Sequence, residues 1–316
     1  MAGKRAFIIR IFVPLCLVLL TSCSSSPPTS TATPTPTHVV NRPTPVLSPS
    51  PTSTPNKTPT HYTEKVLYSG RLRPDDMAFD KQGNILFSDF YHGTISRINS
   101  DGSVSLVISG IAGPEGIVVL SDGTMIIAEQ RTNRILVLAP GSKSLSVLRV
   151  LPGVPSGASC KDGVDGIAFD PFNKTLIIPD SPTGAVYSLS LDGNTMKLLN
   201  SNIVRPVGAA VDSQGNIYVA DECGGAVDRI TPDGKMTKLG GFGMPDDVAF
   251  DSAGNMLVTD LKTTIHALVR VLNGSGKHQT LASKGFIEPQ GLLVDKNDNI
   301  YVSDDYADKI VEFLPA

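Results

Sequence analysis

Two acidic pairs, Asp75–Asp76 and Asp246–Asp247, are the side chains best placed in this sequence to do chemistry. Each pair follows a proline that opens a pattern which the chain repeats six times. The second acid of each pair replaces a glycine that the other four copies keep, at Gly116, Gly166, Gly208 and Gly291. Adjacent carboxylates can bind a cation or form an acidic mouth for a polar substrate. They can equally be solvated loop charges, and the residues alone leave both interpretations open.

A histidine after the second apolar run of the first repeat is another candidate. His92 could act as a general base, because an imidazole changes charge near neutral pH. The alternative is an exposed loop histidine without a catalytic role. The sequence has no Gly-x-Ser-x-Gly elbow, no paired Cys or His at zinc spacing and no phosphate-binding loop. Serine hydrolases, zinc enzymes and nucleotide binders are therefore unsupported.

The elements that must position these side chains are short β-hairpins. In the clearest copy, residues 205–230, two apolar runs flank the turn sequence Asp-Ser-Gln-Gly-Asn. Glycine and asparagine accept the positive φ of a tight turn, and the runs are too short for helices. An acidic residue ends the second run of every copy, so we interpret these acids as architecture. The other copies begin at Pro74, Pro114, Val164, Pro245 and Pro289.

The spacing of the repeats predicts the fold. They begin roughly 40 to 50 residues apart, which is the period of a four-stranded propeller blade. One such sheet cannot bury its own faces, whereas sheets stacked radially bury one another. We therefore predict an all-β six-bladed β-propeller, with four antiparallel strands per blade, over residues 62–316. The last copy supplies only three strands, so we expect residues 64–69 to complete the last blade and remove an exposed sheet edge.

The repeated pattern resembles the NHL repeat. It consists of Pro-x-Gly, an apolar run, Asp, Gly-Asn, a second apolar run, Asp, and then Arg or Lys before Ile. The copies at Pro206 and Pro289 match best, and the resemblance covers essentially the whole globular region. It implies a propeller that serves as a binding surface for proteins, glycans or small ligands. The chain has no Trp, which argues against the Trp-Asp propellers.

The same repeats are similar to the SMP-30/gluconolactonase propellers, which are hydrolases with a divalent metal, usually calcium, in the central channel. The resemblance implies metal ligands at the start of each innermost strand, which here are Asp75, Glu115, Asp165 and Asp246. It also implies that Asp246 is the catalytic base, beside a metal that polarises the substrate carbonyl. The fourth blade departs from the family, because Val207 cannot ligate a metal.

Two of the four cysteines fall in the predicted propeller. Cys160 lies in the loop leading into blade three, and Cys223 lies between the second and third strands of blade four. Loops of these two kinds open on the same face of a propeller. Outside the cytosol, this arrangement favours a disulfide that ties neighbouring blades. Two free, partly buried thiols are the alternative.

The N-terminus predicts export and lipid attachment. Residues 1–22 combine a basic start, an apolar stretch of about 15 residues and a small-residue exit, which is typical of a signal peptide. The sequence Leu-Thr-Ser before Cys23 resembles the lipobox of bacterial lipoproteins, in which the cysteine becomes the lipidated N-terminus. Residues 23–61 are mostly Ser, Thr and Pro with almost no charge, which predicts a disordered or polyproline II linker.

Together these features predict a monomeric binding or sensing module in the cell envelope, extracytoplasmic and held at the membrane only through lipidated Cys23. The expected partner is an unidentified protein, a glycan or a small polar ligand. The formal net charge of −3 and the lack of a basic patch argue against nucleic acid. Two alternatives remain, a calcium-dependent lactone or ester hydrolase and a purely structural envelope protein.

Overall fold

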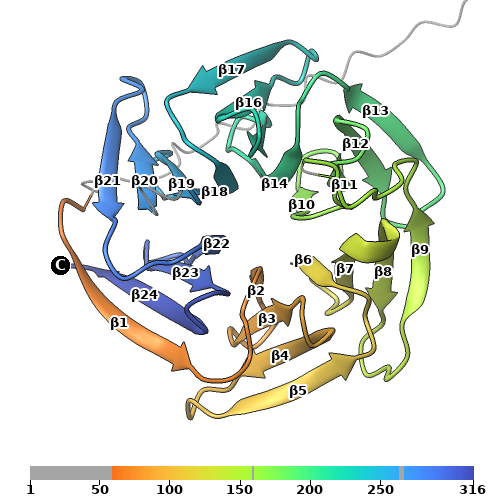
Figure 1. Cartoon of the computed structure of the whole chain (residues 1–316), viewed down its shortest axis with the longest axis horizontal. Helices are drawn as coiled ribbons and strands as arrows, with labels where there is room; N and C mark the ends of the chain where they lie inside the picture. Colours follow the sequence, from red (N-terminus) through yellow and green to blue (C-terminus); the bar gives the residue numbers. More distant parts are fainter. Residues whose placement is uncertain (1–58, 159, 263–266) are drawn as a thin grey trace, which may run out of the picture. The chain divides into compact units, whose positions relative to one another are not determined.

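The computed structural model describes residues 59–158, 160–262 and 267–316. These residues belong to the compact unit Ser53–Ala316, while the unit Met1–Thr52 lies outside the described residues. Cys23, the signal peptide and most of the linker therefore lie outside them too. In the described part, six four-stranded sheets are arranged radially around a common centre (Figure 1). The six-bladed propeller predicted from the repeats is confirmed.

The blades follow the order of the repeats, and the strands of each blade succeed one another from the channel outward. Blade one contains β2 (Met77–Phe79), β3 (Ile85–Asp89), β4 (Thr94–Ile98) and β5 (Val104–Ser109). Blade two contains β6 (Pro114–Val119), β7 (Met125–Glu129), β8 (Arg134–Leu138) and β9 (Ser146–Val150), with the short 3-10 helix η1 (Gln130–Thr132) after β7. Blade three contains β10 (Ala168–Asp170), β11 (Thr175–Asp180), β12 (Ala185–Ser190) and β13 (Met196–Asn200).

The second half of the ring repeats this layout. Blade four contains β14 (Pro206–Val211), β15 (Ile217–Asp221), β16 (Ala226–Ile230) and β17 (Met236–Gly240). Blade five contains β18 (Pro245–Phe250), β19 (Met256–Asp260), β20 (Ala267–Val271) and β21 (His278–Ala282). Blade six contains β22 (Pro289–Val294), β23 (Ile300–Asp304), β24 (Lys309–Pro315) and β1 (Tyr62–Ser69).

The ring is closed by the N-terminal strand. β1 pairs antiparallel with β24, from Tyr62 opposite Pro315 to Ser69 opposite Lys309. Figure 1 shows β1 on the outside of the last blade, beside β24. The prediction that the N-terminal segment completes blade six is confirmed. Pairing the first and the last strand of the propeller in one sheet leaves β24 without an open edge.

The recurrent acids hold the loops, as the repeat pattern indicated. In the first turn of blade four, one oxygen of Asp212 accepts the backbone N–H groups of Gln214 and Asn216 at 2.8 and 2.9 Å. The acid that ends each second strand accepts a backbone N–H from the segment leading into its own blade. In blade five, for example, Asp260 accepts from Gly243 at 2.7 Å and from Met244 at 2.9 Å. These bonds fix the segment that begins the innermost strand.

The core lies between neighbouring blades. One buried cluster joins Ile126 and Ile135 of blade two to Leu176, Ile178 and Leu189 of blade three. Strands alternate the side chains they present to their two faces, so each sheet contributes to two such clusters. The sheets therefore bury one another, and the ring holds the start of every innermost strand in a fixed place.

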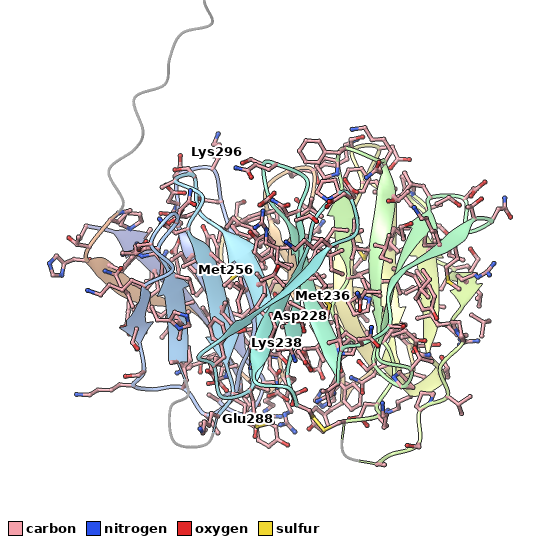
Figure 2. All side chains as sticks on the ribbon, turned by 90° about the horizontal axis from the view of Figure 1, so that it is seen from above. Asp228, Met236, Lys238, Met256, Glu288 and Lys296 are labelled. Carbon is pink, nitrogen blue, oxygen red and sulfur yellow. A yellow bond between two sulfur atoms is a disulfide. The ribbon has the colours of Figure 1, made fainter. Side chains whose placement is uncertain are left out.

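One buried acid has no such role. Asp228 of β16 is fully buried, and neither of its carboxylate oxygens has a hydrogen-bond partner among the described residues. Its closest cation is Lys238, whose Nζ is 3.9 Å away (Figure 2). Burial raises the pKa of Asp228 to about 6. At a pH between the pKa of the unfolded chain and 6, the folded protein holds a proton that the unfolded chain has released. The free energy of unfolding therefore falls as the pH rises toward and through 6.

We expect Asp228→Asn to stabilise the protein at pH 8 by about 1–3 kcal/mol, because it removes a buried charge without a hydrogen bond. At pH 5 the difference should shrink, since wild-type Asp228 is then protonated in the folded state. Urea unfolding of both proteins at the two pH values measures the effect. Equal stability at pH 8, or a larger gain at pH 5, would contradict this account of Asp228.

Candidate functional site

A cavity of about 280 Å³ lies where the loops leading into the innermost strands meet the loops that follow the second strands. Two positions in each repeat build most of its wall. The start of the innermost strand contributes Asp75, Glu115, Asp165, Asp246 and Gln290. The residue directly after the second strand contributes Phe90, Gln130, Glu222, Leu261 and Asp305. The structure thus brings together all four carboxylates that the family resemblance suggested as ligands.

Two of these carboxyl groups influence each other. Asp75 and Glu115 are both buried and line the same cavity. Burial is the main reason that the pKa of each group is raised well above its usual range, and the neighbouring charge of Asp165 adds to this. A carboxyl group with a raised pKa is suited to donate a proton, and a neighbouring carboxylate can accept one.

Asp246 is the carboxylate best placed to meet a ligand. Its exposed fraction is 8%, it lines the cavity, and within the described residues no hydrogen bond reaches its carboxylate. Burial is the main reason that the pKa of Asp246 is raised well above its usual range, with the charges of Asp165 and Asp75 as further causes. Because this carboxylate faces the cavity and receives no hydrogen bond from the described residues, a ligand that supplied a donor would be favoured.

Asp165 is held by an arginine that the sequence reasoning missed. Arg205 places Nη2 3.4 Å from Oδ2 of Asp165, and Gln130 donates to the same oxygen at 3.2 Å. The guanidinium also pairs with Asp162 at 3.4 Å and with Glu222. Burial raises the pKa of Asp165, while the charge of Arg205 opposes that rise. The available signal was the Arg-Pro dipeptide, which opens only the first and fourth repeats.

Comparison with known proteins relates part of this chain to a family. The family model described as the SMP-30/Gluconolactonase/LRE-like region matches residues 161–259. The chain resembles the SMP-30/gluconolactonase propellers. The match covers Asp165, Arg205, Glu222 and Asp246. No curated protein is similar enough to this chain to count as a match.

Solved structures share the fold of this SMP-30/gluconolactonase-like chain. A gluconolactonase from Xanthomonas campestris has a TM-score of 0.67 at 15% identity, covering 82% of this chain and 91% of its own. A streptogramin B lyase has a TM-score of 0.60 at 14% identity, covering 81% and 99%. An auxiliary nutrient binding protein from Bacteroides thetaiotaomicron has a TM-score of 0.63 at 14% identity, covering 77% and 69%. At such identities the likeness concerns the fold alone.

The calcium site that the resemblance implied does not fit the residues of this SMP-30/gluconolactonase-like channel. Val207 is fully buried in the core with Val248 and Val258, so it contributes nothing to the cavity. Asp165 is already engaged by Arg205 and Gln130. Across the described ranges, no group of three or more His, Cys, Asp or Glu side chains is arranged to hold a metal ion. The positive charge in contact with these acids is the guanidinium of Arg205.

The second acids of the two pairs are not part of the cavity wall. One oxygen of Asp76 accepts the N–H of Ile117 in the next blade at 2.9 Å, and Asp247 accepts that of Leu292 at 2.9 Å. Burial raises the pKa of Asp76 to about 7 and that of Asp247 well above the usual range. These acids were expected at the channel rim, and the structure shows them joining blades one and two and blades five and six.

Near His92, an aromatic pair rather than the imidazole borders the cavity. Nδ1 of His92 lies 2.7 Å from Oδ2 of Asp89, and the residue is not among those lining the cavity. Tyr91 and Tyr306 do line it, with hydroxyls 3.4 Å apart. The guanidinium of Arg73 stacks on both rings, at 3.7 and 4.5 Å from their centroids. The two tyrosine rings, each contacted by the guanidinium of Arg73, form a partly apolar edge beside the acidic cavity.

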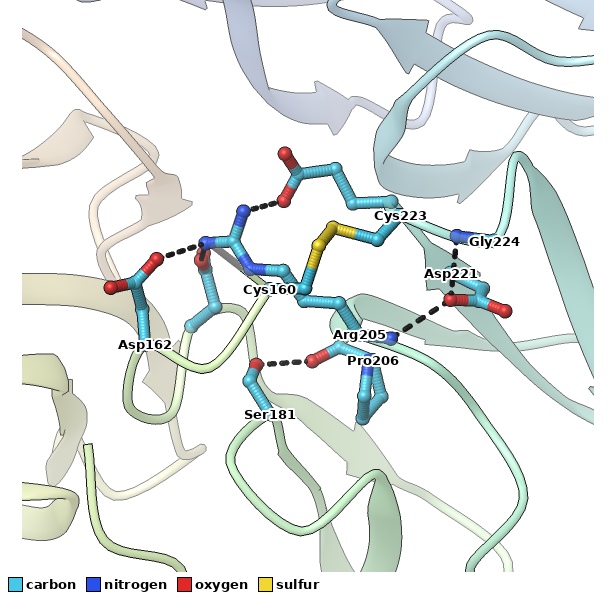
Figure 3. The surroundings of a disulfide bond; sticks show 10 residues. Cys160, Asp162, Ser181, Arg205, Pro206, Asp221, Cys223 and Gly224 are labelled. Carbon is cyan, nitrogen blue, oxygen red and sulfur yellow. Dashed lines mark hydrogen bonds and ion pairs between the residues drawn. A yellow bond between two sulfur atoms is a disulfide. The ribbon is translucent and has the colours of Figure 1, made fainter. Parts of the chain in front are cut away.

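A disulfide joins Cys160 to Cys223, with their Cα atoms 6.1 Å apart (Figure 3). It connects the loop leading into blade three with the loop after β15 in blade four. This is the pairing that the loop positions favoured. The bridge stands beside the cavity, next to Arg205 and its partners. In the described part of the chain, no helix is long and apolar enough to cross a membrane.

Proposed function

We propose that the channel mouth is a binding site for a small polar ligand that carries a positive charge or several hydrogen-bond donors. The observation that carries this proposal is the buried carboxylate of Asp246, which lines the cavity without a hydrogen bond from the described residues. A ligand donor at this place would pair with a carboxylate that receives no hydrogen bond from the described residues. A volume of about 280 Å³ lies just below the range of about 300–1,000 Å³ that is usual for ligand pockets, which favours a small ligand.

Charge favours the same class of ligand. Eight carboxyl-bearing residues and one arginine, Arg205, are among the described residues that line the cavity. Such a wall attracts cations and hydrogen-bond donors and repels anions. Tyr91 and Tyr306 add a flat edge against which a ring could stack. An amino sugar combines a ring, hydroxyl donors and an ammonium group, and it serves as the probe of this proposal.

A matched series of probes tests the proposal. Glucosamine, glucose and glucuronate share a pyranose ring and carry a positive, a neutral and a negative group. Calorimetric titration at pH 6.5 should show glucosamine binding about ten-fold or more tighter than glucuronate, with glucose between them. Tightest binding of glucuronate, or binding of none of the three, would contradict the proposal.

A lactone or ester hydrolase is the second candidate, and the observation that favours it is the placement of two buried carboxyl groups, Asp75 and Glu115, in one cavity wall. One member could protonate a leaving oxygen while the other accepts a proton from water. The family match to residues 161–259 supports this candidate. Its calcium-dependent form would require Asp165 to be released from Arg205. Hydrolysis of glucono-δ-lactone by wild type but not by Asp75→Asn would move the assignment to this candidate.

The proposal includes a location outside the cytoplasm. Lipidation of Cys23 would anchor the chain to a membrane, and the Ser, Thr and Pro stretch to residue 61 would hold the propeller away from it. A binding module displayed in this way would act as a sensor or capture device in the cell envelope. The disulfide between Cys160 and Cys223 is consistent with an oxidising compartment. Detergent-phase partitioning of the expressed protein measures the anchor.

A further inference from the structure

Arg205 stands between two blades at the edge of the cavity. It precedes β14 of blade four, while Asp162 and Asp165 precede β10 of blade three. Its guanidinium contacts both of these acids at 3.4 Å and also pairs with Glu222 of its own blade. Figure 3 shows the guanidinium of Arg205 directed toward Asp162. One positive charge is therefore enclosed by three carboxylates.

The backbone holds Arg205 in this place from both sides. Its N–H donates to Oδ1 of Asp221 at 2.9 Å, and the carbonyl of the following Pro206 accepts from the hydroxyl of Ser181 at 2.6 Å. Ser181 belongs to the loop after β11 in blade three, so these bonds also span the two blades. The proline itself fixes φ at the next position. The arginine is thus positioned by the architecture and not by its side-chain ion pairs alone.

The disulfide fixes the carboxylates in turn. Cys160 lies two residues before Asp162, and Cys223 directly follows Glu222. The bridge therefore ties together the two loops that carry the acids facing Arg205 (Figure 3). Three carboxylates held in this way cannot move apart freely if the positive charge between them is lost. Such an enclosure would then require another cation or added protons.

The charge of Arg205 also acts on Asp246, on the wall of the same cavity. Asp246, which has no hydrogen bond from the described residues, lines the same space, and the charge of Arg205 counteracts part of the rise in its pKa. Among the described lining residues, Arg205 is the only Arg or Lys. It contacts Asp165, which the family resemblance assigns to the metal.

We propose that Arg205 is the resident cation of this channel, standing in for a divalent metal, and that removal of its charge converts the cavity into a metal-binding site. The wild-type protein then has no need of calcium to hold its carboxylates together. Oxygen ligands from Asp162, Asp165 and Glu222 would suit a hard cation once the guanidinium is gone. This inference goes beyond the proposed ligand site, because it concerns what balances the charge of the channel.

Terbium luminescence tests the proposal with the metal alone as probe. The chain has no Trp, and two of its seven tyrosines, Tyr91 and Tyr306, line the cavity, so excitation of tyrosine detects Tb³⁺ bound near them. The full-length wild type and Arg205→Lys, which keeps the charge, should give no saturable signal. Arg205→Met should bind Tb³⁺ about ten-fold or more tighter than either, and excess Ca²⁺ should displace it. Adding Asp165→Asn to Arg205→Met should abolish the gain.

Two outcomes would overturn the proposal. Equal Tb³⁺ binding by wild type and Arg205→Met would show that Arg205 does not occupy the metal position. An Arg205→Met protein that stays unfolded both with and without Ca²⁺ would show that a metal cannot replace the guanidinium. Folding that Ca²⁺ restores in this variant but does not change in wild type would support the proposal. Glucosamine titration of the wild type is a separate readout, so failure of the proposed ligand site leaves the metal result intact.

Discussion

A protein lacking residues 62–70 is expected to lose more than about 4 kcal/mol of stability and to associate. The deletion removes β1, which pairs with β24 along its length from Tyr62 to Ser69. Leu67 and Tyr68 also pack against the buried cluster that contains Phe87 and Ile310. Without β1, the ring loses this packing, and β24 becomes an exposed edge strand of the last blade.

Urea unfolding and size-exclusion chromatography measure the two effects. The matched control removes an equal length of the predicted linker, residues 40–48, and should unfold like the full chain. A deletion protein that unfolds at the same urea concentration as that control and elutes at the same volume would show that β1 does not close the ring.

Loss of the disulfide should have the second large effect. Cys160 and Cys223 are 63 residues apart, and a bridge over such a separation typically stabilises a fold by about 2–4 kcal/mol. The double variant Cys160→Ser/Cys223→Ser should therefore unfold at a lower urea concentration than the oxidised wild type. The carboxylates around Arg205 should also become less constrained, because Asp162 and Glu222 lie in the two bridged loops.

Reduction provides the control for the disulfide. A reducing agent should lower the unfolding midpoint of the wild type to that of the double variant and leave the double variant unchanged. A thiol titration of unfolded, unreduced protein should find no reactive thiol at either position. Equal midpoints for the oxidised wild type and the double variant would contradict a stabilising role for the bridge.

The fold could be predicted because both the hairpin pattern within each repeat and the spacing between repeats indicate a propeller. The runs around Gly215 and Asn216 encode a hairpin, and the spacing of the copies encodes a blade. The last repeat supplies only three strands, so the fourth strand of blade six had to come from another part of the chain, and β1 provides it. Acids present in every copy were correctly interpreted as architecture, and Asp260 shows why, since it accepts two backbone N–H groups.

The site was less predictable, because the same repeat position can serve the cavity in one blade and the core in another. β14 and β18 begin with the same irregularity, yet Asp246 of β18 lines the cavity whereas the apolar Val207 of β14 is buried in the core. The sequence pattern placed residue 207 at the channel, whereas Arg205 and Glu222 are the side chains of this blade that line the cavity. Asp76 and Asp247 differ from the expected rim in a similar way, since their carboxylates bond to the next blade.

The most direct test of the central claim is calorimetric titration of glucosamine into wild type, Asp246→Asn and Asp228→Asn. Each variant removes one buried acid, but only Asp246 lines the cavity. If the channel mouth binds its ligand through Asp246, then Asp246→Asn should weaken glucosamine binding about ten-fold or more, and Asp228→Asn should bind like wild type. Unchanged binding in Asp246→Asn, or an equal loss in both variants, would contradict the account.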